Sequence, residues 1–118
     1  LMAALRSIPK TPIRMVTRYR VVSPEECQTI IDQGGKFTPP TGGGSTPLSG
    51  QPGKWFWGTL EDAKQFGPFW YRGQPYNVLK VEVPETAIPT IEPGIDLGGT
   101  GYFYTLEDLA NAVISVAQ

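Results

Sequence analysis

The segment Gly53-Lys-Trp-Phe-Trp-Gly-Thr-Leu-Glu-Asp-Ala-Lys-Gln-Phe-Gly67 decides the fold of this chain of 118 residues. Its three adjacent aromatic residues are typical of a strand, which we place at residues 54–58. The Thr-Leu-Glu-Asp sequence at 59–62 is a helix start, because a threonine hydroxyl can accept a bond from the first turn and acidic residues favour the helix dipole there. Gly67 and Pro68 predict the end of this helix. A strand that leads directly into a capped helix indicates a mixed α+β domain.

A basic strand precedes this segment. We expect it over residues 16–22, followed by a helix from Pro24 to about Gln33. Ser23 is the expected N-cap, and Glu26 completes a capping box. Because side chains alternate along a strand, the two faces carry Arg18, Arg20 and Val22 on one side, and Tyr19 and Val21 on the other.

The ends and the middle of the chain read as connecting segments. Residues 1–15 contain two prolines and no clear period, so we predict an arm or linker there. Residues 36–53 include three consecutive glycines and predict a long, flexible loop. The remainder is expected to form one domain over residues 16–118.

The second half of the chain contains two more expected strands. Residues 78–83 alternate as a strand, and residues 101–104 form an aromatic one. The segment after Pro84 is rich in proline and is expected to be irregular. A final helix is expected from Thr105 to about Val116. In the first of these strands, Leu79, Val81 and Val83 are expected to point inward, with Lys80 and Glu82 outward.

Composition removes several classes of catalytic site. The chain has no histidine, which excludes a Ser-His-Asp triad, a Cys-His pair, a two-histidine ribonuclease and the usual zinc sites. The one cysteine, Cys27, cannot form an internal disulfide, and we expect it to be a small buried hydrophobe. Any chemistry must therefore use carboxylates, arginines, hydroxyls and aromatic rings.

Charge is distributed unevenly along the chain. Residues 1–24 carry five basic and no acidic residues, whereas the remainder carries five basic and eleven acidic residues. The basic part can contact phosphates, but the acid-rich remainder disfavours a broad nucleic-acid interface. No apolar run approaches the roughly 20 residues of a membrane helix, and the N-terminus lacks the apolar core of a secretory signal. We therefore expect neither a membrane nor a nucleic acid as partner.

Arginine and aromatic side chains are the candidate ligand-binding groups. Arg20 lies near the end of its strand, and its planar fork can bind a phosphate through two bonds, although a solvated or surface-paired arginine is the alternative. Trp55 and Trp57 share one strand face, where they can stack a flat ring or belong to the core. For Thr59, the sequence favours a helix cap over a ligand contact.

The acidic residues divide into surface and site candidates. Glu82 beside Lys80 fits a surface pair. Glu107 follows the aromatic strand at a helix start, where it can favour the helix dipole or act as a catalytic carboxylate.

Four stretches in this order resemble one protein family. They are similar to the C-terminal toxin domains of bacterial Rhs-type and related polymorphic toxins, in particular the ADP-ribosyltransferase-like, TreTu-like group. The similarity runs from about Arg18 to Ala112. The four stretches are Tyr19-Arg-Val-Val-Ser-Pro-Glu-Glu26, Gly53-Lys-Trp-Phe-Trp-Gly-Thr-Leu-Glu-Asp-Ala63, Val78-Leu-Lys-Val-Glu-Val-Pro84 and Gly101-Tyr-Phe-Tyr-Thr-Leu-Glu-Asp-Leu109.

The resemblance implies a small split antiparallel β-core with peripheral short helices and an NAD cleft between the sheets. The family has an arginine on the first strand, a hydroxyl or aromatic residue on the second, and a glutamate near the end. Arg20 and Glu107 are the implied catalytic residues. Because the chain has no Ser-Thr-Ser and no Glu-x-Glu or Gln-x-Glu, Glu82 and Glu92 remain alternatives to Glu107. The implied NAD contacts are Arg20, Val21, Trp55, Trp57 and Thr59.

The implied function is transfer of ADP-ribose from NAD to a macromolecule in the cytoplasm of a recipient bacterium, with the translation factor EF-Tu as a target. Such a domain is secreted as the tip of a larger effector, and a cognate immunity protein is its expected partner. A ribonuclease toxin that works with glutamate and arginine alone is the alternative activity. A binding module whose aromatic residues are only core is a third interpretation.

Overall fold

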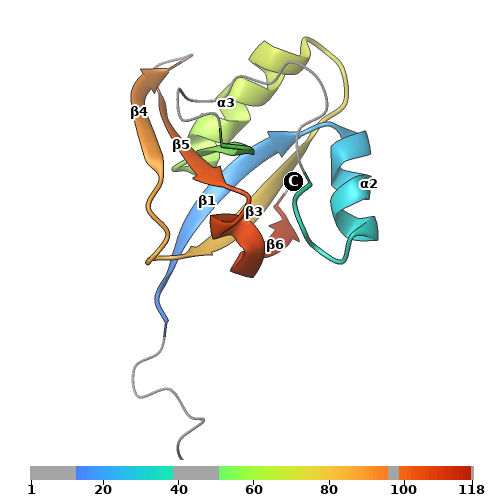
Figure 1. Cartoon of the computed structure of the whole chain (residues 1–118). Helices are drawn as coiled ribbons and strands as arrows, with labels where there is room; N and C mark the ends of the chain where they lie inside the picture. Colours follow the sequence, from blue (N-terminus) through green and yellow to red (C-terminus); the bar gives the residue numbers. More distant parts are fainter. Residues whose placement is uncertain (1–12, 39–50, 96–98, 118) are drawn as a thin grey trace, which may run out of the picture.

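The computed structural model describes residues 13–38, 51–95 and 99–117. Much of the expected arm and most of the glycine-rich loop lie outside these residues. The described chain forms one antiparallel sheet of six strands in the order β4-β5-β2-β1-β3-β6, with two α-helices (Figure 1). The elements are β1 Met15–Val22, α2 Pro24–Asp32, β2 Gly53–Trp57, α3 Leu60–Tyr71, β3 Asn77–Pro84, β4 Thr90–Ile95, β5 Gly99–Thr105, the 3-10 helix η1 Asp108–Asn111 and β6 Val113–Val116. The α+β expectation is confirmed.

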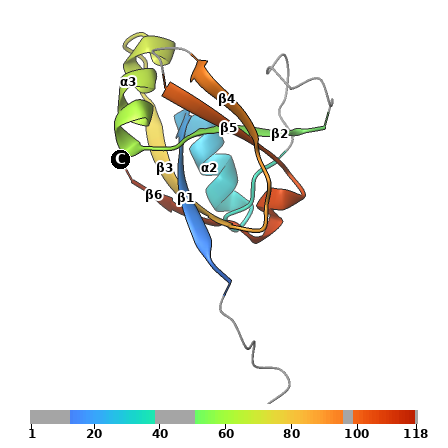
Figure 2. The same ribbon diagram turned by 90° about the vertical axis from the view of Figure 1, so that its left-hand side faces the viewer.

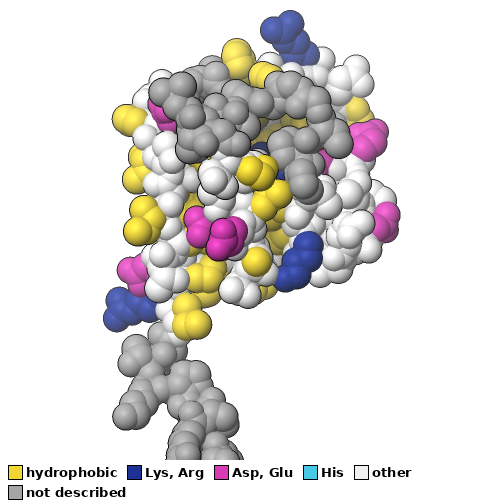
Figure 3. Space-filling model, viewed as in Figure 1, with side chains coloured by type: hydrophobic (Ala, Val, Ile, Leu, Met, Phe, Trp, Pro, Cys, Tyr) yellow, Lys and Arg dark blue, Asp and Glu magenta, His cyan; other side chains and the backbone are white. Residues whose placement is uncertain are grey.

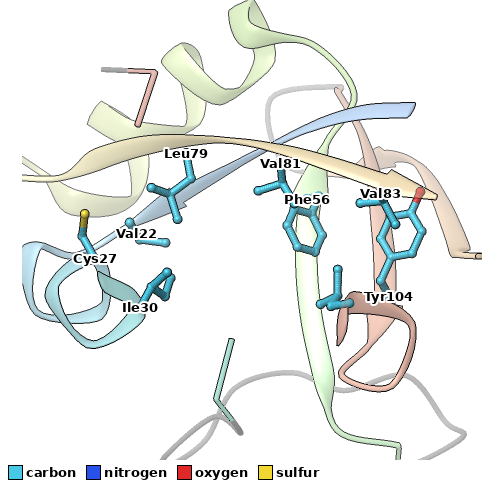
Figure 4. Close-up of a cluster of buried hydrophobic side chains, with 9 residues drawn as sticks. Val22, Cys27, Ile30, Phe56, Leu79, Val81, Val83 and Tyr104 are labelled. Atoms are coloured by element: carbon cyan, nitrogen blue, oxygen red, sulfur yellow. The ribbon is translucent and has the colours of Figure 1, made fainter. Parts of the chain in front are cut away.

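The helices cover opposite faces of the sheet (Figures 1 and 2). Helix α2 packs on a core that includes Val22 of β1 and Phe56 of β2, and Figure 4 shows this cluster running from α2 across β1 and β3 to β5. Helix α3 packs on Val21 and Trp57, the neighbours of those two residues on the opposite face. The alternation expected for β1 and β2 is therefore confirmed.

Helix α3 continues past the predicted stop at Gly67 and Pro68. Gly67 is buried, and a Cβ there would lie 2.5 Å from the ring of Tyr76, so this glycine provides a close approach rather than an end. The helix instead ends at Tyr71, and its C-cap, Arg72, adopts the left-handed conformation with φ 49°. The cost of Pro68 inside the helix is offset by the packing of α3 on the sheet.

Two strands replace segments that were expected to be irregular or helical. The segment after Pro84 forms β4, an edge strand whose register shifts between Glu92 and Ile95, where a proline is tolerated. The predicted final helix is wrong beyond its first turn. Thr105 does accept the N–H of Asp108 at 3.2 Å, but only η1 follows, and the β-branched residues of β6 pair with β3.

The sheet opens in its middle, between β1 and β2. Strand β1 pairs with β3 along its whole length, and β2 pairs with β5 along its whole length. Strands β1 and β2 pair with each other at one position, Tyr19 with Trp57, although the structure describes every residue of both strands. The sheet thus consists of two three-stranded halves that meet at this pair. We call the unpaired stretch beyond it, between residues 20–22 of β1 and residues 53–56 of β2, the seam.

Candidate functional site

Arg20 bridges the seam. Its Nε and Nη2 donate to the two carboxylate oxygens of Glu26 on α2, at 2.8 and 3.1 Å, and its Nη1 donates to the carbonyl oxygen of Trp55 on β2, at 2.9 Å. The side chains are 17% exposed for Arg20 and 27% for Glu26, so the pair is largely shielded from water. The guanidinium therefore ties together β1, α2 and the unpaired edge of β2.

The N-terminus of α2 positions Glu26. Ser23 accepts the N–H of Glu26 at 3.0 Å, so the predicted cap is confirmed. The carboxylate, however, turns to Arg20 instead of back to the cap, and the reciprocal bond of the predicted capping box is replaced. A bidentate, charge-assisted pair is stronger than one bond to a neutral N–H, which explains the preference.

Lys54 adds a second cation to this region. It is a buried charged residue, 7% exposed, on the same sheet face as Phe56. Burial lowers the pKa of Lys54, against the opposing effect of the Glu26 charge. Burial raises the pKa of Glu26, but hydrogen bonds from Arg20 and the charges of Arg20 and Lys54 outweigh it, so that pKa lies below its ordinary value. Glu26 is therefore ionised at neutral pH.

Arg18 lies two residues before Arg20 on the same face. Its guanidinium carbon is 3.9 Å from the ring centre of Tyr102, and its Nε donates to the hydroxyl of Tyr104 at 3.2 Å. Both tyrosines belong to β5, across the sheet from β1. Gly58 makes room for this contact, since a Cβ there would lie 3.0 Å from the Tyr102 ring. Arg18 is thus held on an aromatic platform.

The predicted aromatic contacts occupy different environments. Trp57 is 7% exposed, and its ring tilts against Phe66 of α3, 5.1 Å between centres. Val21 is buried in the same cluster. Trp55 is partly buried and packs edge to face on Phe103, in addition to its carbonyl contact with Arg20. Trp55 therefore meets Arg20 through its backbone, while its ring lies on the sheet face opposite to the arginines.

Thr59 caps α3, as the sequence predicts. Its hydroxyl accepts the N–H of Asp62 at 3.1 Å, and its backbone is extended. The side chain is exposed, so its place as a ligand contact stays a prediction.

Glu107 lies two residues beyond the C-terminal end of β5. It is exposed and immediately precedes η1. The register sets Arg20 level with Tyr102, two strands away, and Thr105 is three residues further along β5. In a regular sheet, with strands about 4.8 Å apart and about 3.3 Å per residue, the backbones of Arg20 and Thr105 would be roughly 14 Å apart, and the opening between β1 and β2 lies between them. The carboxylate that the fold brings to Arg20 is Glu26.

The two alternative glutamates are surface residues. Glu82 lies 3.7 Å from Lys80, with side chains 40% and 45% exposed, which confirms the expected surface pair. Glu92 is exposed on the edge strand β4.

Sequence reasoning missed Glu26 and Lys54 as members of the site. Each residue already had a local explanation in the sequence: Glu26 fits a helix start, and Lys54 begins the aromatic strand. One signal was present: Glu26 follows Arg20 by six residues, a spacing that lets a strand side chain meet the first turn of the next helix.

No protein-family model matches the chain, and neither a curated protein nor a solved structure does. Within residues 13–38, 51–95 and 99–117, no three His, Cys, Asp or Glu side chains are grouped to hold a metal ion. None of the described helices has the length and apolar character needed to cross a bilayer.

Proposed function

We propose that this chain is the toxin domain of a bacterial polymorphic toxin and transfers ADP-ribose from NAD to a macromolecule of the recipient cell. One observation supports the proposal: the sheet opens between β1 and β2, Arg20 bridges the opening, and Arg18 lies beside it on the ring of Tyr102. The absence of histidine from the sequence fits a reaction that needs none. The translation factor EF-Tu is the target that the sequence resemblance favours.

The reaction makes demands that these residue types can meet. The bond between ribose C1′ and the nicotinamide nitrogen breaks, and its electron pair leaves with nicotinamide. A nucleophile of the target then bonds to C1′ and releases its proton. Positive charge builds on the sugar meanwhile, so a nearby carboxylate stabilises the transition state, a guanidinium binds the diphosphate, and an aromatic ring orients the leaving group.

We assign the carboxylate role to Glu107. Glu107 is exposed and therefore accessible to a substrate. A separation of roughly 14 Å between the backbones of Arg20 and Thr105 suits a ligand longer than a single phosphate, as a dinucleotide is. Glu26 orients Arg20, because both of its carboxylate oxygens already accept bonds from that guanidinium.

Labelled NAD tests the proposal directly. The purified chain is incubated with NAD labelled on the adenylate and with bacterial lysate, and label on macromolecules is measured. We expect transfer by the wild type, loss with Glu107→Gln, and retention with Glu82→Gln, the matched surface carboxylate. If NAD is not consumed and no macromolecule in the lysate is labelled, the proposed transferase activity is refuted. Expression of the chain in bacteria should also stop growth, with rescue by the cognate immunity protein.

A ribonuclease remains the second candidate, because residues 1–24 carry five basic residues and no acid. The face of the molecule drawn in Figure 3 favours it less. Figure 3 shows Lys and Arg side chains scattered among Asp and Glu on the face in view, without a basic stripe. Loss of RNA in the absence of NAD would support the nuclease over the transferase.

A further inference from the structure

The two arginines of β1 differ in how their charge is balanced. Arg20 is paired with Glu26 through two bonds. Within residues 13–38, 51–95 and 99–117, Arg18 contacts neutral groups: the ring of Tyr102, the hydroxyl of Tyr104 and the carbonyl oxygen of Thr17. Among the described residues, Arg18 has no ion pair, although its side chain is only partly exposed. A shielded guanidinium without a counter-ion favours an external anion.

The contacts of Arg18 also fix its orientation. A guanidinium has five N–H groups, and the described bonds use the Nε hydrogen and one hydrogen of Nη1. The two hydrogens of Nη2 and the second hydrogen of Nη1 remain as a planar fork. The Tyr102 ring supports one face of the group, so little side-chain freedom is left to lose when a ligand binds.

We propose that Arg18, rather than Arg20, binds the diphosphate of the dinucleotide, and that Arg20 is a positioning residue that fixes the seam. This inference rests on the proposed function. Arg18 and Arg20 lie on one face of β1, so a diphosphate on the Arg18 fork lies next to the seam. The fork can bind two phosphate oxygens at once, which a lysine cannot do.

Binding of ADP, measured by calorimetry at low salt, tests this assignment. Nicotinamide riboside, which has no phosphate, is the second probe. We expect Arg18→Ala to weaken ADP binding by about 10-fold or more. The variant should bind nicotinamide riboside with the same affinity as the wild type does. Arg18→Lys, which keeps the charge but loses the fork, should weaken ADP binding to an intermediate degree. Lys80→Ala, which removes an exposed cation elsewhere on the sheet, is the matched control and should bind ADP normally.

A second variant separates binding from folding. Tyr102→Leu removes the platform and keeps the Arg18 side chain, so ADP binding should weaken while the urea midpoint of the variant shows that it is folded. The inference is overturned if the wild type does not bind ADP, or if folded Arg18→Ala binds it as well as the wild type does. If Arg18→Ala still transfers ADP-ribose from NAD, the role of Arg18 is refuted and the proposed function is not. Arg18-dependent ADP binding without NAD cleavage would refute the proposed function and support the anion site.

Discussion

Breaking the Arg20–Glu26 pair should loosen the seam by a measurable free energy. Glu26→Gln keeps the shape of the side chain and one acceptor, but it removes the charge and one of two bonds. A hydrogen bond to a charged group is worth about 1.5–3 kcal/mol. The two side chains are 17% and 27% exposed, so partial solvation reduces this value, and we expect a loss of about 1–2 kcal/mol in the free energy of unfolding. Arg20→Ala should cost about 2–4 kcal/mol, because it also deprives the Trp55 carbonyl of its donor.

Urea denaturation measures both effects. With a slope of about 2 kcal/mol per M, Glu26→Gln should lower the midpoint by about 0.5–1 M at pH 7. In a double-mutant cycle, the Arg20 and Glu26 changes should couple by about 1–2 kcal/mol. Additive changes, with no coupling, would refute the view that this pair fixes the seam.

Acid pH provides an independent check on the same pair. The pKa of Glu26 in the folded chain is below its ordinary value of 4.5. Its contribution to stability is therefore complete above pH 4.5 and is lost as the pH falls through the folded pKa. The difference in stability between wild type and Glu26→Gln should shrink over that range. A difference that stays constant down to the folded pKa would contradict the assigned charge interaction.

Three further substitutions test separate parts of the account. Thr59→Ala should lose about 1 kcal/mol of stability by urea denaturation and Thr59→Ser much less, because serine keeps the capping hydroxyl; equal losses in the two variants would contradict the cap. Lys54→Met should leave stability at pH 7 unchanged or raise it by up to about 1 kcal/mol, because the lowered pKa of this lysine means that folding disfavours its charge; a large loss would show that the charge is needed. Gly67→Ala should cost about 1–3 kcal/mol by thermal or urea unfolding, because the new Cβ meets the Tyr76 ring, and a neutral result would contradict the close packing of α3.

Local patterns could be predicted from the sequence, and pairing between distant segments could not. The strands at β1, β2, β3 and β5 and the caps at Ser23 and Thr59 follow from alternation and from residues three positions apart. Strands β4 and β6 form because they pair with strands elsewhere in the chain. The sequence predicted wrongly an irregular segment in place of β4, because of its prolines, and a helix in place of β6, because a helix start precedes it.

The candidate site was predictable only in its residue types. The sequence indicated an arginine on one strand and tryptophans on another, and the structure brings Arg20 to the backbone of Trp55. The six-residue spacing was the one hint that Glu26 would neutralise Arg20, and nothing in the sequence indicated that Tyr102 would support Arg18, because that contact depends on the order of strands. The roles of Glu107 and Thr59 stay predictions.

A structure of the chain with a hydrolysis-resistant NAD analogue tests the central claim most directly. The account predicts the analogue at the seam between β1 and β2, with its diphosphate on the Arg18 fork and Arg20 still paired with Glu26. An ordered analogue bound away from β1 and β2, or none bound at saturating concentration, would contradict it.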